Sequence, residues 1–187
     1  MKKINYKKMV EKMLIGLISD THIPKRSEKL PDKVFETFKS VDLILHAGDL
    51  VSTEVLDELN KLAPTYAVRG NMDPPTIEEL PPFRVLEMEG VKIGITHGVV
   101  YPKGDLDKLY YIAKELEVKI LISGHTHRPA IETMKDILFI NPGSPTNPRL
   151  SDPTVMLMTI DKGNVDIEAI KVGNPTCAAL NFKPPEK

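Results

Sequence analysis

LIGLISDTH, residues 14–22, is an apolar run that ends abruptly in Asp20, Thr21 and His22. A short run so dense in leucine and isoleucine predicts a strand that is buried on both faces, as the strands of parallel sheets are. Ligands of open α/β sheets bind in the crevice beyond the carboxyl ends of the strands. The stretch therefore indicates a strand, expected over residues 14–19, that delivers Asp20 and His22 to a functional site.

Four further apolar runs end in polar residues in the same way. They are LILHAG before Asp49, TYAVRG before Asn71, VKIGIT before His97, and KILISG before His125-Thr126-His127. We expect their strands at 43–46, 66–68, 91–96 and 119–123. Helices are expected between the strands, at 32–38, 53–62 and 106–117. Alternating strands and helices predict an α/β fold with largely parallel strands.

Past residue 128 the expected strands follow one another without helices. They are placed at 130–134, 137–140, 155–160 and 165–170. Short turns such as Asp161-Lys162-Gly163-Asn164 join them. Because tight turns connect antiparallel neighbours, we expect antiparallel pairing in this part of the chain.

The residues at the five strand ends form one set of possible metal ligands. The set comprises Asp20, His22, Asp49, Asn71, His97, His125 and His127. One such residue alone is more often a cap or a satisfied polar group, but five strand ends out of five favour a shared site. Asp-x-His and His-x-His spacing places both side chains on one side of an extended segment. Imidazole nitrogens, carboxylates and an amide oxygen, without sulfur, suit Mn²⁺, Zn²⁺, Fe or Ni²⁺.

The number of candidate ligands indicates two ions. Seven ligands exceed what one ion accepts, so we expect two divalent transition-metal ions, about 3.5 to 4 Å apart, that share Asp49. Four positive charges against the carboxylates of Asp20 and Asp49 leave a surplus that attracts hydroxide and phosphate. The metals would lower the pKa of a bridging water and neutralise phosphoryl oxygens during in-line attack. This predicts phosphoester hydrolysis by a metal-bound hydroxide, with no side chain as the catalytic group.

The composition is that of one globular, cytoplasmic domain. The chain has 187 residues, of which 41% are hydrophobic and 27% charged, enough to bury a core. Its net charge of −1 argues against a nonspecific nucleic-acid binder. No apolar run reaches the roughly 18 residues of a membrane span, and the single cysteine, Cys177, excludes an intrachain disulfide. We expect a basic N-terminal appendage at 1–12, the domain at 13–172 and a C-terminal tail at 173–187.

The ordered motifs resemble the signature of the calcineurin-like metallophosphoesterase superfamily. They are Asp20-x-His22, Gly48-Asp49, Gly70-Asn71, Thr96-His97-Gly98 and Gly124-His125-Thr126-His127. With Asn141-Pro142-Gly143-Ser144 and Arg149, the resemblance narrows to the small archaeal and bacterial phosphodiesterases, over about residues 13–172. It implies a two-sheet β-sandwich flanked by helices in four αββα layers. It also implies a small-molecule phosphodiester as substrate, and manganese is the first choice for the metal pair.

The resemblance further implies how the ligands divide between the ions. Asp20, His22, Asp49 and His127 would hold the first ion, and Asp49, Asn71, His97 and His125 the second. Many relatives carry a histidine after the motif asparagine that assists the leaving group, whereas this chain has Met72. Methionine cannot give or take a proton, so we expect a preference for good leaving groups. Arg149 is the candidate for a phosphate contact.

Two other functions remain open from the sequence. Thr21-His22-Ile23-Pro24, with Arg26, Leu30 and Pro31, also resembles the retromer subunit of this fold, a scaffold for partner proteins. The complete histidine set favours an enzyme over this alternative. A nuclease for single-stranded nucleic acid is disfavoured by the near-neutral charge and by ten aromatic residues without tryptophan. We expect neither membrane nor nucleic-acid partners and leave a homo-oligomer open.

Four polar residues near the motifs are expected to have other roles. His46 is expected in the core or behind the metal ligands. Asp73 is expected to cap the turn before Pro74, and Arg69 to lie at the surface or in packing. Ser144 lacks the sequence surroundings of a nucleophile elbow.

Overall fold

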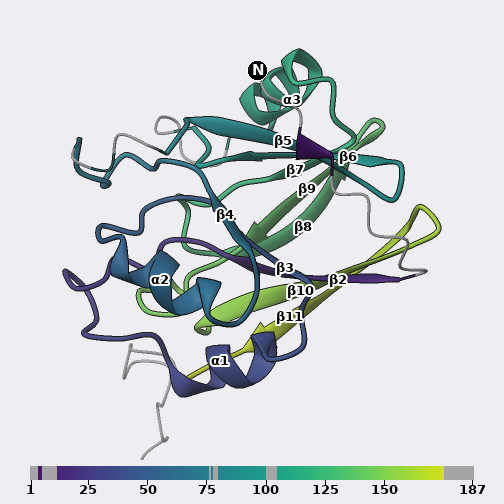
Figure 1. The fold of residues 1–187 in the computed structure, drawn as a ribbon. Helices are drawn as coiled ribbons and strands as arrows, with labels where there is room; N and C mark the ends of the chain where they lie inside the picture. The colour runs from purple at the N-terminus through teal and green to yellow at the C-terminus, as the bar shows by residue number, and fades with distance from the viewer. Residues whose placement is uncertain (1–3, 6–11, 76, 78–79, 100–104, 175–187) are drawn as a thin grey trace, which may run out of the picture.

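The described elements form two β-sheets that pack face to face, with helices on both outer faces (Figure 1). The computed structural model describes residues 4–5, 12–75, 77, 80–99 and 105–174, the first two by their backbone alone. The four-layer arrangement that the sequence predicts is confirmed. Of the expected C-terminal tail, residues 175–187 lie outside the described residues.

The first sheet places three strand ends of the predicted site side by side. Its described strands are, in order, β11 (Asn164–Lys171), β10 (Thr154–Asp161), β2 (Met13–Ile18), β3 (Leu43–His46) and β4 (Thr65–Ala67). β2, β3 and β4 run parallel, so their carboxyl ends meet at one edge. β10 is antiparallel to both β2 and β11.

The second sheet supplies the other two predicted strand ends. Its described strands are, in order, β1 (Ile4–Asn5), β5 (Phe83–Met88), β6 (Val91–Thr96), β7 (Ile120–Ile122), β9 (Ile137–Pro142) and β8 (Pro129–Met134). β6 and β7 run parallel. β1 pairs with β5 at the edge of this sheet, so two residues of the expected appendage join the sheet by their backbone.

The helices cover the outer faces because each turns an apolar stripe towards a sheet. α1 (Asp32–Phe38) begins after Pro31, and α2 (Glu54–Asn60) follows β3. Both helices pack on the first sheet, where Phe38 and Leu59 lie in one buried cluster with Ile44. α3 (Leu106–Glu115) packs on the second sheet. A third apolar cluster fills the space between the sheets. No helix in the described part of the chain is long and apolar enough to cross a membrane.

The strands after residue 128 pair with one another antiparallel, as expected, in the hairpins β8–β9 and β10–β11. The sequence did not indicate that β9 also pairs in parallel with the earlier strand β7. The reason is that β8 takes the edge of the sheet, and its hairpin returns β9 in the direction of β7. β5, which is not among the strands expected from the sequence, pairs antiparallel with β6 across Glu89-Gly90. Both turn residues have positive φ, 48° and 75°, as a two-residue hairpin turn of type I′ requires.

Candidate metal centre

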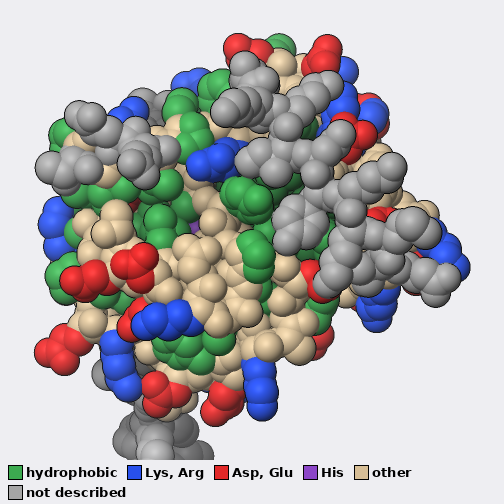
Figure 2. Space-filling model, viewed as in Figure 1, with side chains coloured by type: hydrophobic (Ala, Val, Ile, Leu, Met, Phe, Trp, Pro, Cys, Tyr) green, Lys and Arg blue, Asp and Glu red, His purple; other side chains and the backbone are tan. Residues whose placement is uncertain are grey.

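The structure brings the predicted ligands together at the edge where the two sheets end. Asp20, His22, Asp49 and Asn71 follow strands of the first sheet, and His97, His125 and His127 follow strands of the second. Two groups with converging ligand atoms result: Asp20, His22 and His127, and Asp49, His97 and His125. Each group has members from both sheets. The histidines are almost entirely covered, and little histidine surface is visible on the face in Figure 2.

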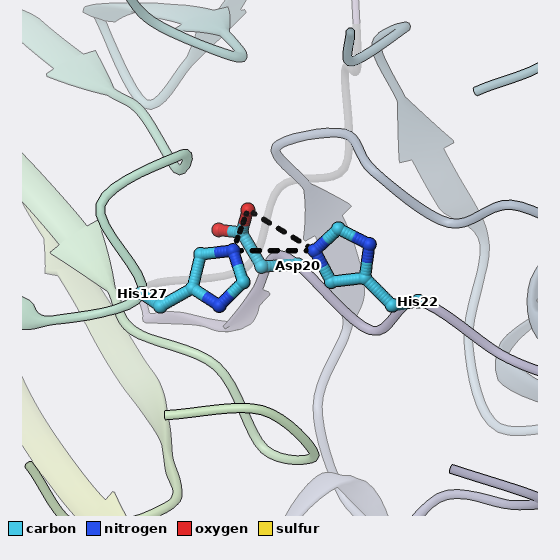
Figure 3. A group of neighbouring side chains, drawn as sticks. All are labelled: Asp20, His22 and His127. Atoms are coloured by element: carbon cyan, nitrogen blue, oxygen red, sulfur yellow. Dashed lines mark hydrogen bonds and ion pairs between the residues drawn. The ribbon is translucent and has the colours of Figure 1, made fainter. Parts of the chain in front are cut away.

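The first group is compact. The Nε2 atoms of His22 and His127 lie 3.2 Å apart, and both point towards the Asp20 carboxylate (Figure 3). Asp20 Oδ1 is 3.3 Å from His127 Nε2 and 3.9 Å from His22 Nε2. A position between these three atoms is therefore surrounded by two imidazole nitrogens and one carboxylate oxygen.

The second group is arranged in a similar way. His97 Nε2 lies 3.2 Å from His125 Nδ1 and 3.3 Å from Asp49 Oδ2. The Asn71 side-chain oxygen lies 3.1 Å from the same His97 nitrogen, so it belongs to this group. The structure thus brings these four predicted residues together.

Asp49 stands between the two groups. Its Oδ2 is 3.3 Å from His97 Nε2 and 3.6 Å from His22 Nε2, so one carboxylate oxygen faces both groups. Its other oxygen, Oδ1, accepts a 2.7 Å hydrogen bond from the backbone N–H of Met72. This bond fixes the rotation of the carboxylate and keeps Oδ2 in the shared position.

Backbone carbonyls determine which ring nitrogens face the centre. His127 Nδ1 lies 2.5 Å from the Asn147 carbonyl oxygen, and His97 Nδ1 lies 2.8 Å from that of Ala47. A carbonyl oxygen only accepts, so Nδ1 carries the proton in both rings. The Nε2 atoms of neutral rings then present lone pairs to the centre, as metal-binding histidines do.

The backbone is held in an unusual conformation at five of the seven predicted ligands. Asp20, His22, Asp49, His125 and His127 have φ between 46° and 70°, in the left-handed region. Residues other than glycine lose roughly 1 to 2 kcal/mol there. Such strain persists where the surroundings enforce it and is concentrated at functional sites.

Glycine lets the strands approach the ligands closely. A Cβ atom added to Gly124 would lie 2.7 Å from Asp20 Oδ2 and 2.9 Å from Ser19 Cβ. At Gly48 a Cβ atom would lie 2.9 Å from His97 Nδ1, and its φ is +88°. Any side chain at either position would displace a predicted ligand.

Burial shifts the charge state of the first group. It raises the pKa of Asp20 to about 7, against the opposing effects of the His97 charge and the backbone N–H of His125. It lowers the pKa of His127 to about 4 and also lowers that of His22. The histidines are therefore neutral at pH 7, and the buried Asp20 carboxylate lacks sufficient positive charge nearby.

In the second group, interactions between Asp49 and His97 outweigh the effect of burial on their pKa values. Burial alone would raise the pKa of Asp49, but hydrogen bonding and charge from His97 lower it overall. The pKa of His97 is raised, because the Asp49 hydrogen bond and the carboxylate charges of Asp20 and Asp49 outweigh its burial. A divalent cation would fit this donor set, since it would stabilise both carboxylates and accept the imidazole lone pairs.

Two of the neighbouring polar residues, His46 and Ser144, support the centre from outside the ligand set, and Arg149 lies at the surface beside it. His46 is fully buried; its Nδ1 accepts from Gly48 N–H, and its Nε2 lies 3.2 Å from Thr21 Oγ1. Ser144 donates a 2.7 Å hydrogen bond to the Asp20 carbonyl, so its hydroxyl supports a ligand loop. Arg149 is exposed, and its charge contributes to the lowered pKa of His127.

Asp73 has a larger role than the turn cap that its sequence position suggests. Its Oδ2 accepts from the backbone N–H groups of Asp49, at 3.0 Å, and Gly70, at 2.7 Å. Its Oδ1 accepts from Val51 N–H at 2.7 Å. One buried carboxylate thus joins the loops that carry Asp49 and Asn71. A motif-internal aspartate two residues after a candidate ligand is the signal that could have identified it.

Comparison with known proteins places the chain in a family. A profile of the calcineurin-like phosphoesterase superfamily domain matches residues 13–163, and the chain belongs to this superfamily. A probable metallophosphoesterase of Methanothermobacter thermautotrophicus is 52% identical over 171 residues, which is 91% of this chain and 99% of the relative.

Solved structures share the fold. Zinc-bound Vps29 of Entamoeba histolytica is 31% identical, with a TM-score of 0.72 over 86% of this chain and all of that chain. A predicted phosphoesterase of Streptococcus pneumoniae is 28% identical, with a TM-score of 0.71 over 87% of this chain and 91% of its own. The chain is therefore similar both to a hydrolase class and to Vps29, a vacuolar protein sorting protein.

Proposed function

We propose that the chain is a metal-dependent phosphodiesterase that hydrolyses small-molecule phosphodiesters in the cytoplasm with two divalent ions. The observation that carries the proposal is the position of Asp49 Oδ2, which faces both ligand groups. The first ion would be held by Asp20, His22, Asp49 and His127. The second would be held by Asp49, Asn71, His97 and His125. Mn²⁺ is our first candidate, and Zn²⁺, Fe and Ni²⁺ suit the same donors.

The chain's own residues would orient the substrate and set the charge of the site. When bound, the ion pair would generate a nucleophile from water and neutralise charge on the phosphoryl oxygens. Arg149, whose charge reaches His127, would contact a phosphate oxygen at the exposed side of the first group. Met72 is 40% exposed next to Asn71, but its side chain has no proton to give. The departing group would therefore leave without help from this position.

Elemental analysis together with a hydrolysis screen tests the proposal. We expect about two ions per chain, hydrolysis of bis(4-nitrophenyl) phosphate, and recovery of activity with Mn²⁺ after chelation. Asp49→Ala should lose both ions, whereas His22→Ala should chiefly weaken one. Asp166→Asn, on the exposed side of β11, is the control and should keep both. Loss of one ion in both site variants would refute a shared Asp49.

The similarity to Vps29 supports a second candidate, a protein-interaction scaffold of the same fold. Vps29 of Chaetomium thermophilum has been solved in complex with a cyclic peptide, at 24% identity to this chain. A scaffold would hold metal or none but would show no metal-dependent hydrolysis across mono- and diester substrates. The same screen therefore separates the two functions.

A further inference from the structure

A cavity of about 540 Å³ lies on the outer face of the second sheet, beside α3. The register of β8 and β9 determines which side chains form the floor of the cavity. Ala130 pairs with Asn141 and Glu132 with Phe139 across β8 and β9, and alternate side chains share one face, so all four side chains face the cavity. Leu109 of α3 closes the opposite side. A volume of this size is typical of small-molecule sites.

The cavity adjoins the candidate metal centre. Gly98, which follows His97, and Gly124, which precedes His125, form part of its wall. Thr126, between His125 and His127, lines it as well. The Asn141 amide donates to the Gly124 carbonyl at 2.8 Å and to Thr126 Oγ1 at 3.0 Å, which fixes this wall. A group in the cavity would thus lie beside a phosphate at the metal ligands.

The lining combines an apolar interior with a charged rim. Phe139 and Leu109 are 4% and 6% exposed, so they form the apolar end. The exposed side chains of Arg128, Glu132 and Arg149 stand at the rim. Arg128 Nε donates to the Arg149 carbonyl at 3.0 Å, which ties the two arginine positions together. Two positive charges against one negative charge suit an organic group that carries a phosphate.

We propose that this cavity binds the organic group that the phosphodiester retains after hydrolysis, and that it selects a nucleoside-sized group with an apolar, planar body. The inference rests on the proposed phosphodiesterase function. The Phe139 ring, with Leu109 beside it at the apolar end, favours a planar apolar group, and Glu132 at the rim can accept hydrogen bonds from amino or hydroxyl groups. A methyl group would leave the cavity empty and gain nothing from it.

Filling the cavity tests the inference. Ala130→Phe places a ring in the cavity, whereas Ile131→Phe, one residue along β8, turns its side chain to the other face and is the matched control. The metal-loaded full chain is assayed with thymidine 5′-(4-nitrophenyl phosphate) and methyl 4-nitrophenyl phosphate, which share a leaving group. We expect Ala130→Phe to raise KM for the thymidine ester about tenfold, the scale of one lost apolar contact surface. Its kcat/KM for the methyl ester should match that of the control.

Binding provides a readout that does not require turnover. The affinity for thymidine 5′-monophosphate, measured by calorimetry, should fall in Ala130→Phe and persist in Ile131→Phe. Equal affinity in both variants, an unchanged KM, or an equal rise in KM for both esters would overturn the inference. If the wild type hydrolyses neither ester, the proposed function fails. The calorimetry still tests whether the cavity binds the nucleoside group. The smaller Ala130→Leu replaces Ala130→Phe if the latter loses methyl-ester turnover.

Discussion

Asp73→Asn is the substitution that best tests how the loops of the centre are held. Asp73 is 8% exposed, and its carboxylate accepts three backbone N–H bonds, from Asp49, Val51 and Gly70. Asparagine retains one acceptor oxygen, which can keep the two bonds made by Oδ2. Its amide nitrogen would then face the N–H of Val51, donor against donor.

The cost of this substitution can be worked from those bonds. A lost bond to a charged group costs about 1.5 to 3 kcal/mol. The two remaining bonds lose their charge assistance, so we expect about 3 kcal/mol less stability in all. That is a large part of the 5 to 15 kcal/mol typical of a domain.

Urea unfolding of the metal-free chain, in the presence of a chelator, measures this difference without the contribution of bound ions. Asp166→Asn, an exposed carboxylate on β11, serves as the control and should change stability by less than about 0.5 kcal/mol. After metal loading, Asp73→Asn should also bind less metal, since both Asp49 and Asn71 depend on its loops. A variant as stable as the control would show that the three bonds contribute little, and the reasoning would be refuted.

Three further predictions concern the leaving group, the N-terminus and pH. Met72→His should raise turnover of alkyl esters by up to about 10² while barely changing nitrophenyl esters; a flat wild-type plot of log rate against leaving-group pKa would mean that another acid exists. Removal of residues 1–12 should cost no more than about 1 kcal/mol in urea unfolding, because β1 adds only a two-residue pairing; a larger loss would show that the segment packs. Burial lowers the pKa of His46 from 6.5 to about 3, so the unfolded chain takes up the proton first as the pH falls. The stability advantage of the metal-free wild type over His46→Gln should therefore fall by about 2 kcal/mol from pH 7 to pH 5, since the pKa shifts of Asp20 and His127 are common to both proteins. Equal slopes of stability against pH for both proteins would contradict this.

The strand ends could be predicted from sequence because two independent signals coincide there. Buried parallel strands leave continuous apolar runs, and the chemistry begins where each run stops, as at Asp20 and His97. β3 and β6 have the predicted bounds, and the other early strands differ by one or two residues. The position of a residue at the end of a strand depends only on the direction of that strand, which is why the sequence could indicate that these side chains meet at one edge.

The features that sequence reasoning missed depend on contacts between distant segments. β5 mixes exposed, half-buried and buried residues and includes Arg84 and Glu87, so it has no continuous apolar run to reveal it. The direction of β9 is set by which neighbour it pairs with, and a run of residues does not encode its neighbour. The role of Asp73 arises only when the loops at Asp49 and Gly70 meet. The cavity beside α3 likewise requires the register of β8 and β9.

The mixed origin of each ligand group links metal affinity to the relative position of the two sheets. Asp20 and His22 follow a strand of the first sheet, whereas His127 follows a strand of the second. In the other group, Asp49 follows a strand of the first sheet, whereas His97 and His125 follow strands of the second. An ion in either group would be bound by residues from both sheets, so it would hold the two sheets in one relative position. Substitutions among the apolar residues between the layers, far from any candidate ligand, would therefore be expected to change the affinity for metal. In the other direction, each bound ion adds its binding free energy to the cohesion of the layers.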